Sequence, residues 1–123
     1  MSPEAIKQDF ESALVKHISF KSKLRSFLYG NNSAEAPLRD PDQCGLGKWI
    51  ATRRAGDYAH LPEIIELDQQ HQLIHQQANR LMDLHVAGHR DEALAGFKEV
   101  QLVADHMVAV LQTMEGKLRT AGV

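Results

Sequence analysis

The sequence predicts an all-α protein, an antiparallel four-helix bundle of three long helices and one short helix. Apolar residues recur at spacings of three and four over three long stretches, which is the period of an amphipathic helix. Residues that start or end helices stand at the borders of those stretches. Apolar and polar residues alternate over no useful length, so no strand is expected. A bundle follows because each apolar stripe needs another stripe to cover it.

The first long helix is expected over residues 3–29. Ser2 can cap it, Pro3 suits its first position, and Glu4 lies near the positive end of its dipole. The Gly-Asn-Asn-Ser run at 30–33 ends it with residues that tolerate turn geometry. The inward face carries one histidine among apolar side chains: Ile6, Phe10, Ala13, Leu14, His17, Phe20, Leu24, Phe27 and Leu28.

The short helix is expected over residues 44–54. The preceding stretch, residues 34–43, is rich in turn formers and is interpreted as a connection. Leu46, Trp49 and Ile50 have helical spacing, Gly56 is a stop signal, and the helix should begin at or near Cys44.

Two long helices follow, over residues 62–87 and 91–119. Pro62 opens the first and Gly88 ends it, while Asp91 is expected to cap the second. The inner face of the helix at 62–87 contains Ile64, Leu67, His71, Ile74, His75, Ala78, Leu81 and Met82. The inner face of the last helix contains Ala93, Phe97, Val100, Ala104, Met107, Leu111, Met114 and Leu118.

Composition limits the possible functions. A length of 123 residues with 43% hydrophobic content predicts a single domain, residues 1–123, that needs no disulfide. A net charge of −2 argues against nucleic acid or an anionic membrane as partner. The sequence contains no run of 18 apolar residues, so no membrane-inserted helix is expected. The first ten residues lack the apolar core of a signal peptide. The one cysteine fits a reducing compartment, so a cytoplasmic protein is expected.

Three histidines stand on faces that should be buried, where an imidazole is costly unless both ring nitrogens find partners. His17 lies midway along the first helix. His71 and His75 lie one turn apart on the third helix and project side by side, as two ligands of one metal do. The spacing alone means little, since His85 and His89 share it. That second pair straddles a predicted helix end and is rejected as a site.

The only cysteine supplies a fourth candidate ligand. A lone thiol forms no internal disulfide, so its chemical role would be metal binding or redox reactivity. If the first and third helices pack together, His17 meets His71 and His75, and Cys44 closes the set. Three imidazoles and one thiolate suit one tetrahedral zinc ion per chain.

The neighbours of the cysteine favour the same hypothesis. Gly45 and Gly47 would give the backbone freedom to bring the sulfur to the ion, and Trp49 would anchor the short helix on the core. Arg53 and Arg54 are too few charges to mark an acidic partner. His60 and His106 are expected at the surface.

Residues 44–49 read Cys-Gly-Leu-Gly-Lys-Trp, which resembles the C-x-[LF]-G-x-W signature of chemoreceptor zinc-binding domains. These domains occur in bacterial chemoreceptors and diguanylate cyclases. The order of the other residues is also similar: His17 on the first helix, then the cysteine block, then His71 and His75 after a Leu-Pro-Glu run at 61–63. The resemblance spans roughly residues 10–114. The family often has a tryptophan shortly after the first histidine, and Phe20 stands near that place here.

The resemblance implies a non-enzymatic sensor that binds zinc through His17, Cys44, His71 and His75. It implies a response to zinc or to oxidants such as hypochlorous acid, transmitted to chemotaxis or to cyclic-di-GMP synthesis. It also implies a homodimer. A chemoreceptor or cyclase module would be supplied in cis or in trans.

Two other functions fit parts of the sequence. A di-iron oxygen-binding bundle of the hemerythrin type would need more inward histidines together with bridging carboxylates such as Glu63, Glu66 or Asp68. A metal-free interaction module would use the apolar stripe of the last helix as core or as a dimer seam.

Four protein ligands leave zinc no open coordination position, so metal-dependent hydrolysis is not expected.

Overall fold

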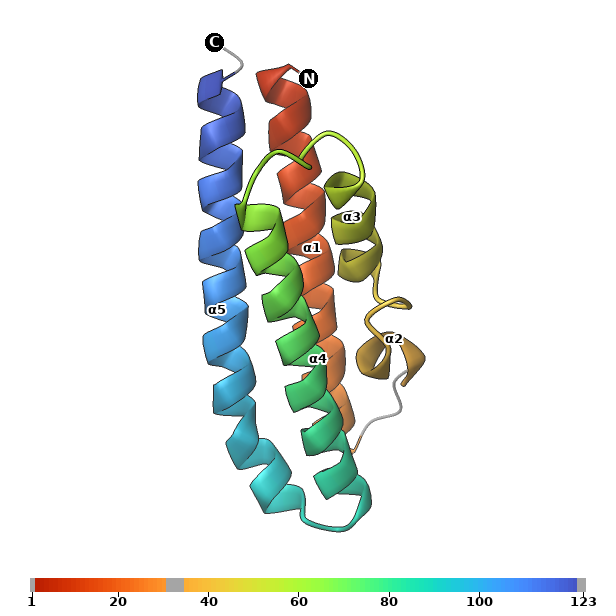
Figure 1. The fold of residues 1–123 in the computed structure, drawn as a ribbon. Helices are drawn as coiled ribbons and strands as arrows, with labels where there is room; N and C mark the ends of the chain where they lie inside the picture. Colours follow the sequence, from red (N-terminus) through yellow and green to blue (C-terminus); the bar gives the residue numbers. More distant parts are fainter. Residues whose placement is uncertain (1, 31–34, 122–123) are drawn as a thin grey trace.

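The structure is a computed structural model that describes residues 2–30 and 35–121. Three long helices, α1 (Pro3–Leu28), α4 (Glu63–Val86) and α5 (Arg90–Ala121), lie side by side along the molecule (Figure 1). Two short helices, α2 (Ala36–Arg39) and α3 (Gly45–Arg54), pack against α1 and α4. Together α2 and α3 take the place of a fourth helix. The predicted all-α bundle is confirmed, and the described residues contain no strand.

The chain reverses direction at each long turn, as Figure 1 shows. It descends α1, returns through α2 and α3, descends α4 and returns along α5. The return leg through α2 and α3 therefore runs opposite to α1 and α4, α5 runs antiparallel to α4, and α1 and α4 run the same way. None of the described helices is long and apolar enough to cross a membrane.

The predicted helix ends are close to the observed ones. The Ser2 hydroxyl accepts the Ala5 N–H at 3.1 Å, so Ser2 caps α1 as predicted. Gly30 and Gly88 follow α1 and α4 with φ of +88° and +92°, a left-handed geometry that favours glycine. The expected cap at Asp91 was wrong: α5 begins at Arg90, so Asp91 lies within its first turn.

The core lies between the long helices and under α3. All eight residues predicted on the inner face of α4 are buried. On α5, Val103 and Val110 are buried as well, while Phe97 and Leu118 pack at the edge of the core. The stripe on α5 is wider than predicted because this helix packs against both α4 and α1.

Helix α2 was missing from the sequence prediction. Residues 36–39 were interpreted as a connection, yet they form one helical turn in which Leu38 is fully buried. Asn79 of α4 fixes this turn, because its side-chain amide donates to the Arg39 carbonyl at 3.1 Å. The turn formers were recognised correctly, but a single buried leucine gives no periodic signal.

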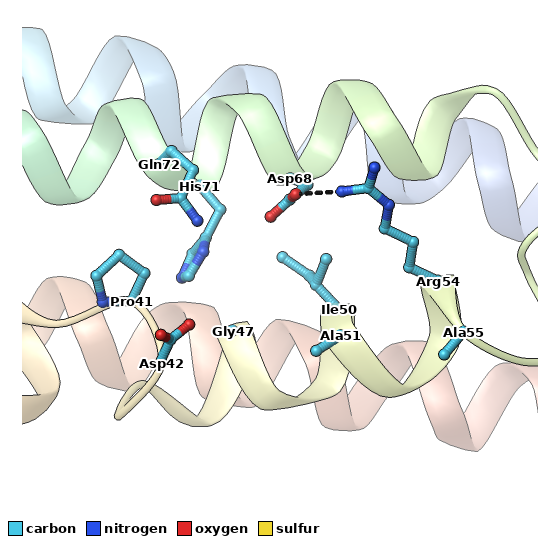
Figure 2. A pocket seen from close by; sticks show the side chains of 10 residues that line it. All are labelled: Pro41, Asp42, Gly47, Ile50, Ala51, Arg54, Ala55, Asp68, His71 and Gln72. Carbon is cyan, nitrogen blue, oxygen red and sulfur yellow. Dashed lines mark hydrogen bonds and ion pairs between the residues drawn. The ribbon is translucent and has the colours of Figure 1, made fainter.

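A cavity of about 520 Å³, hereafter the α3–α4 cavity, opens between α3 and α4. Figure 2 shows Asp68 and His71 directed from α4 toward the space that Gly47 and Ile50 of α3 border. Arg54 donates to Asp68 at 2.7 Å across one end of it. The cavity brings His71 close to solvent although that ring is 2% exposed.

Candidate metal centre

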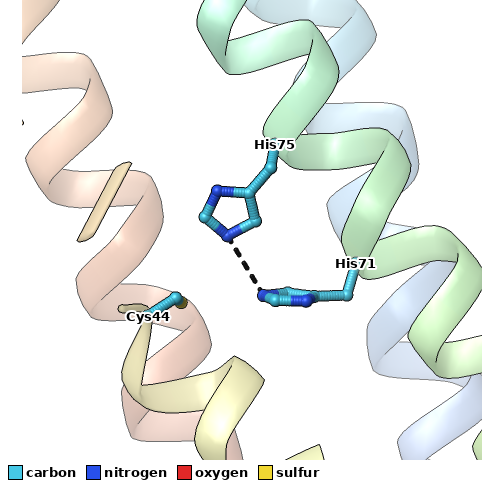
Figure 3. Close-up of side chains that lie close together, drawn as sticks. All are labelled: Cys44, His71 and His75. Atoms are coloured by element: carbon cyan, nitrogen blue, oxygen red, sulfur yellow. Dashed lines mark hydrogen bonds between the residues drawn. The ribbon is translucent and has the colours of Figure 1, made fainter. Parts of the chain in front are cut away.

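Three of the four predicted ligands come together. Cys44 stands at the N-cap of α3, and His71 and His75 face it from α4 (Figure 3). Their candidate ligand atoms, the cysteine Sγ and one ring nitrogen of each histidine, all lie within 4.8 Å of one another. All three side chains are buried. Within the described residues this is the only group of three or more metal-binding side chains that converges in this way.

The two histidines are already oriented toward a common point. The His75 Nδ1–H donates to the Leu38 carbonyl at 2.7 Å, which leaves a lone pair on Nε2. That Nε2 lies 3.1 Å from the Nε2 of His71. In most metal-binding histidines, the ring nitrogen that does not bind the metal donates its N–H to a carbonyl or carboxylate oxygen. The missed helix α2 therefore has a role in the site, because it supplies that carbonyl.

Phe20 fixes the other side of the His75 ring. The centroids of the two rings are 4.7 Å apart. Phe20 stands near the place where the resemblance leads us to expect a tryptophan, and the structure gives it a packing role beside a candidate ligand. The substitution does not remove a donor from the site.

His17 is buried in the bundle, but it is not part of the converging group. It is 1% exposed, and neither of its ring nitrogens has a hydrogen-bond partner of good geometry, although the nearby Ala104 backbone opposes the lowering of its pKa. A buried imidazole without partners costs free energy, and a metal ion is one group that would remove this cost. His17 is close enough that a positive charge on its ring would lower the pKa of His71. The complete ligand set of His17, Cys44, His71 and His75 stays a prediction.

The histidines are uncharged at neutral pH. Burial lowers the pKa of His71 to about 3, and the nearby His75 and His17 lower it further. Burial also lowers the pKa of His17 to about 4, with Lys21 acting in the same direction. The pKa of His75 is lowered by burial, although its bond to the Leu38 carbonyl opposes the shift. Neutral imidazoles are the form that coordinates a metal.

The donors present fit zinc. A tetrahedral ion with bonds of about 2.0–2.3 Å holds its ligand atoms about 3.3–3.8 Å apart. The 3.1 Å between the histidine nitrogens and the upper limit of 4.8 Å for the group lie close to that range. Sulfur with imidazole nitrogen disfavours magnesium and calcium, which prefer oxygen.

The sequence profile of one family, described as chemoreceptor zinc-binding domain, matches residues 17–82. This stretch is more than half of the chain and contains all four predicted ligands. The chain belongs to the chemoreceptor zinc-binding domain family. No curated protein and no solved structure matches it. Membership identifies a regulatory zinc-binding domain, and the Cys44, His71 and His75 cluster provides candidate ligands for its zinc.

Gly47 brings α3 of this zinc-binding domain against the site. A Cβ at this position would lie 2.0 Å from the Pro41 carbonyl oxygen and 2.8 Å from Cε1 of His71. At Gly45 a Cβ would meet only the flexible Lys16 side chain, at 3.6 Å. Neither glycine has a positive φ. Close approach at Gly47 is what requires glycine, whereas the freedom of the backbone to bring the sulfur to an ion stays a prediction.

A second polar cluster, which no sequence pattern predicted, lies toward the C-terminal end of α3. Asp9 of α1 accepts hydrogen bonds from the Trp49 indole N–H at 3.1 Å, from the Nε and Nη2 groups of Arg53, and from the Tyr58 hydroxyl. Burial alone would raise the pKa of Asp9, but the hydrogen bonds from Arg53, Tyr58 and Trp49 outweigh it and lower the pKa. Phe10 packs edge-on to Trp49 and stacks on Tyr58. We call Asp9, Trp49, Arg53 and Tyr58 the Asp9 cluster.

The carboxylates that a di-iron centre would use are engaged at the surface. Glu63 accepts from Lys117, Glu66 pairs with His106 at 2.8 Å, and Asp68 accepts from Arg54. None of them belongs to the converging group of donors. The cluster thus contains nitrogen and sulfur donors without a bridging carboxylate.

Proposed function

We propose that this domain is a zinc-dependent sensor that holds one ion through His17, Cys44, His71 and His75. The convergence of three buried donor side chains carries the proposal. The two unpartnered nitrogens of His17 support the fourth ligand, because zinc would give one of them a partner. A full set of protein ligands assigns the domain to sensing rather than to hydrolysis.

Within this site we propose Cys44 as the exchangeable ligand. The histidines lie inside long helices, whereas Cys44 lies at the end of a ten-residue helix and is followed by two glycines. Bound zinc would keep the sulfur as a thiolate, and the thiolate is the form that oxidants such as hypochlorous acid attack. Oxidation of Cys44, or a fall in available zinc, would release the start of α3 from α4.

The Asp9 cluster determines which residues would move when Cys44 is released. Trp49 and Arg53 are held to α1 by Asp9 and do not depend on the metal ligands. We therefore expect the movement at residues 40–44 and in α2, which touches the site through Leu38. Trp49 should therefore be a poor reporter of Cys44 release, because Asp9 holds its indole on α1.

The output of the sensor is proposed from the family. We propose a chemoreceptor or cyclase module as partner, in cis or in trans, and a homodimer as the working form. The stripe of α5 that could have served as a dimer seam is largely buried in the bundle, so a dimer would use another surface. The unpaired thiol of Cys44 fits a reducing compartment such as the cytoplasm.

Zinc affinity of Cys44→Ala tests the function. We expect affinity, measured by competition with a chromophoric chelator, to fall about 100-fold while the helical circular dichroism spectrum is kept. Hypochlorous acid should release zinc from the wild-type chain and leave zinc retention by the variant unchanged. His106→Ala is the matched control, because that exposed histidine pairs only with Glu66. Equal zinc affinity in Cys44→Ala and wild type would refute the proposal.

A further inference from the structure

A second cavity lies beside the candidate site. Its volume is about 270 Å³, and α1, α2 and the start of α3 enclose it. Its walls include Phe20, Leu38 and Cys44, and two lysines, Lys16 and Lys23, border it. We call it the lysine cavity. Cys44 is thus the one candidate ligand that this cavity reaches, just as His71 is the one that the α3–α4 cavity reaches.

The two cavities differ in charge. The α3–α4 cavity is lined by two aspartates, Asp42 and Asp68, and by Arg54, which is paired with Asp68. The lysine cavity is lined by two lysines, and no carboxylate lines it among the described residues. A molecule that reaches the sulfur through the lysine cavity therefore meets positive charge without compensation.

Lys16 is held beside Gly45, the residue after Cys44, by its contacts. Its side-chain carbons from Cγ to Cε run along Gly45, the residue after Cys44, at 3.6–3.9 Å from where a Cβ would stand. Its ammonium donates to the Ser12 hydroxyl at 2.6 Å, which keeps the charge on the α1 side of the cavity. The N-terminus of α3, where Cys44 stands, adds the partial positive charge of a helix dipole.

We infer that small anions reach the Cys44 sulfur through the lysine cavity and are favoured there over neutral molecules of the same size. The inference rests on the proposed function insofar as Cys44 is the reactive ligand of the sensor, and it names the class of reagent that Cys44 meets. Apolar walls weaken screening by water, so the two lysines raise the local anion concentration. The selectivity is electrostatic and falls as ionic strength rises.

Alkylation with iodoacetate and iodoacetamide tests the inference. In both reactions the thiolate sulfur forms a bond to the CH₂ carbon and iodide leaves, but only iodoacetate is an anion. Cys44 is the only thiol, so the rate of its loss reports one site. The ratio of the two rates, iodoacetate over iodoacetamide, is measured at low salt in the native chain and in the chain unfolded in urea, each with and without zinc.

At low salt we expect the iodoacetate-to-iodoacetamide rate ratio of the native chain to be about five times that of the unfolded chain. At high salt the two ratios should become similar. The double variant Lys16→Gln with Lys23→Gln should lose most of this excess. The control Lys7→Gln with Lys98→Gln removes the same net charge at two exposed positions that do not line the cavity, and it should keep the excess. Equal native and unfolded ratios, an unchanged ratio in the cavity variant, or no reaction of the native chain would each overturn the inference.

Zinc affinity of the same proteins separates this result from the proposed function. The cavity variant should keep wild-type zinc affinity, because neither lysine offers a ligand atom at neutral pH. A chain that shows the anion preference but binds no zinc would support the cavity and refute the sensor. A chain that binds zinc through Cys44 but shows no preference for the anionic reagent would support the sensor and refute the inference about the lysine cavity.

Discussion

Two polar clusters beside α3 differ in completeness: the group of candidate metal ligands is buried, and the Asp9 cluster is partly buried. At the C-terminal end the Asp9 carboxylate receives hydrogen bonds from Trp49, Arg53 and Tyr58, and protein groups satisfy its charge. At the N-terminal end Cys44, His71 and His75 converge, and His17 nearby has no partner for either nitrogen. A cluster that the chain satisfies by itself stabilises a fold. A cluster that it leaves incomplete marks a place for an external group.

The difference also divides α3 into an anchored end and an end that depends on the site. Tyr58 and the Trp49 indole tie the anchored end to α1 through Asp9. The other end is preceded by a turn in which the Cys44 N–H donates to the Pro41 carbonyl at 3.3 Å. Loss of the metal would then move one end of a helix whose other end stays in place, which is a local change suited to signalling.

The largest effect is expected from zinc itself, and His17→Leu tests whether His17 completes the site. Zinc at a thousandfold excess over its Kd should stabilise the wild-type chain by about 4 kcal/mol and raise its Tm by more than about 10 °C. In His17→Leu the zinc-dependent rise should be less than half as large. The zinc-free variant should be as stable as wild type or more stable by about 1–2 kcal/mol, because two unpartnered polar atoms are removed.

His85→Leu is the matched control for that experiment. The Nδ1 atom of His85 is also buried without a partner, but His85 lies outside the converging group. This variant should keep the full zinc-dependent rise in Tm measured by calorimetry. A full rise in His17→Leu would exclude His17 from the ligand set, and the three residues of the converging group would remain.

The next largest effect is expected from Gly47→Ala, compared with Gly45→Ala in the same helix. The new methyl group at position 47 would collide with Pro41 and His71 and should cost about 2–3 kcal/mol. Zinc affinity should fall with it, because the His71 ring must move. At position 45 the methyl group makes ordinary contact with Lys16, and replacing a helical glycine should stabilise the chain by up to about 1 kcal/mol.

Urea unfolding and chelator competition measure both glycine variants. Similar stability and affinity in the two variants would show that the approach of α3 to α4 tolerates a side chain. The site would then not depend on how closely α3 packs against His71.

The sequence was sufficient where a signal repeats or where residue types are rare. The inner face of α4 was predicted residue by residue, since eight residues follow one helical period. Cys44, His71 and His75 were found because a thiol and inward imidazoles are unusual in a core and suit one metal. These features depend on local spacing and chemical type, which a single sequence contains.

The rest depends on contacts between distant residues. Asp9 meets Trp49 and Tyr58 across 40 and 49 residues, and no local pattern relates an acid on α1 to an indole on α3. The Leu38 carbonyl that orients His75 is a backbone group, which carries no sequence signature. Gly47 was noticed, but the atoms that exclude a side chain there belong to Pro41 and His71.

The smallest effect concerns the complete cluster and is pH-dependent. Asp9→Asn removes the charge that Arg53, Tyr58 and Trp49 bind, and at pH 7 it should cost about 2 kcal/mol without changing zinc affinity. The pKa of Asp9 is lowered below 3.8 in the folded chain, so the folded state holds its proton less tightly than the unfolded state. The stabilisation is therefore present above pH 3.8 and is lost as the pH falls through the folded pKa.

Urea unfolding of zinc-free wild type and Asp9→Asn between pH 7 and pH 2.5 measures this effect. The difference between their free energies of unfolding should shrink below pH 3.8. The control Glu11→Gln, on the exposed side of α1, should match wild type throughout. A difference that stays constant down to pH 2.5 would mean that packing of Trp49 and Tyr58, and not the Asp9 charge, holds the anchored end of α3.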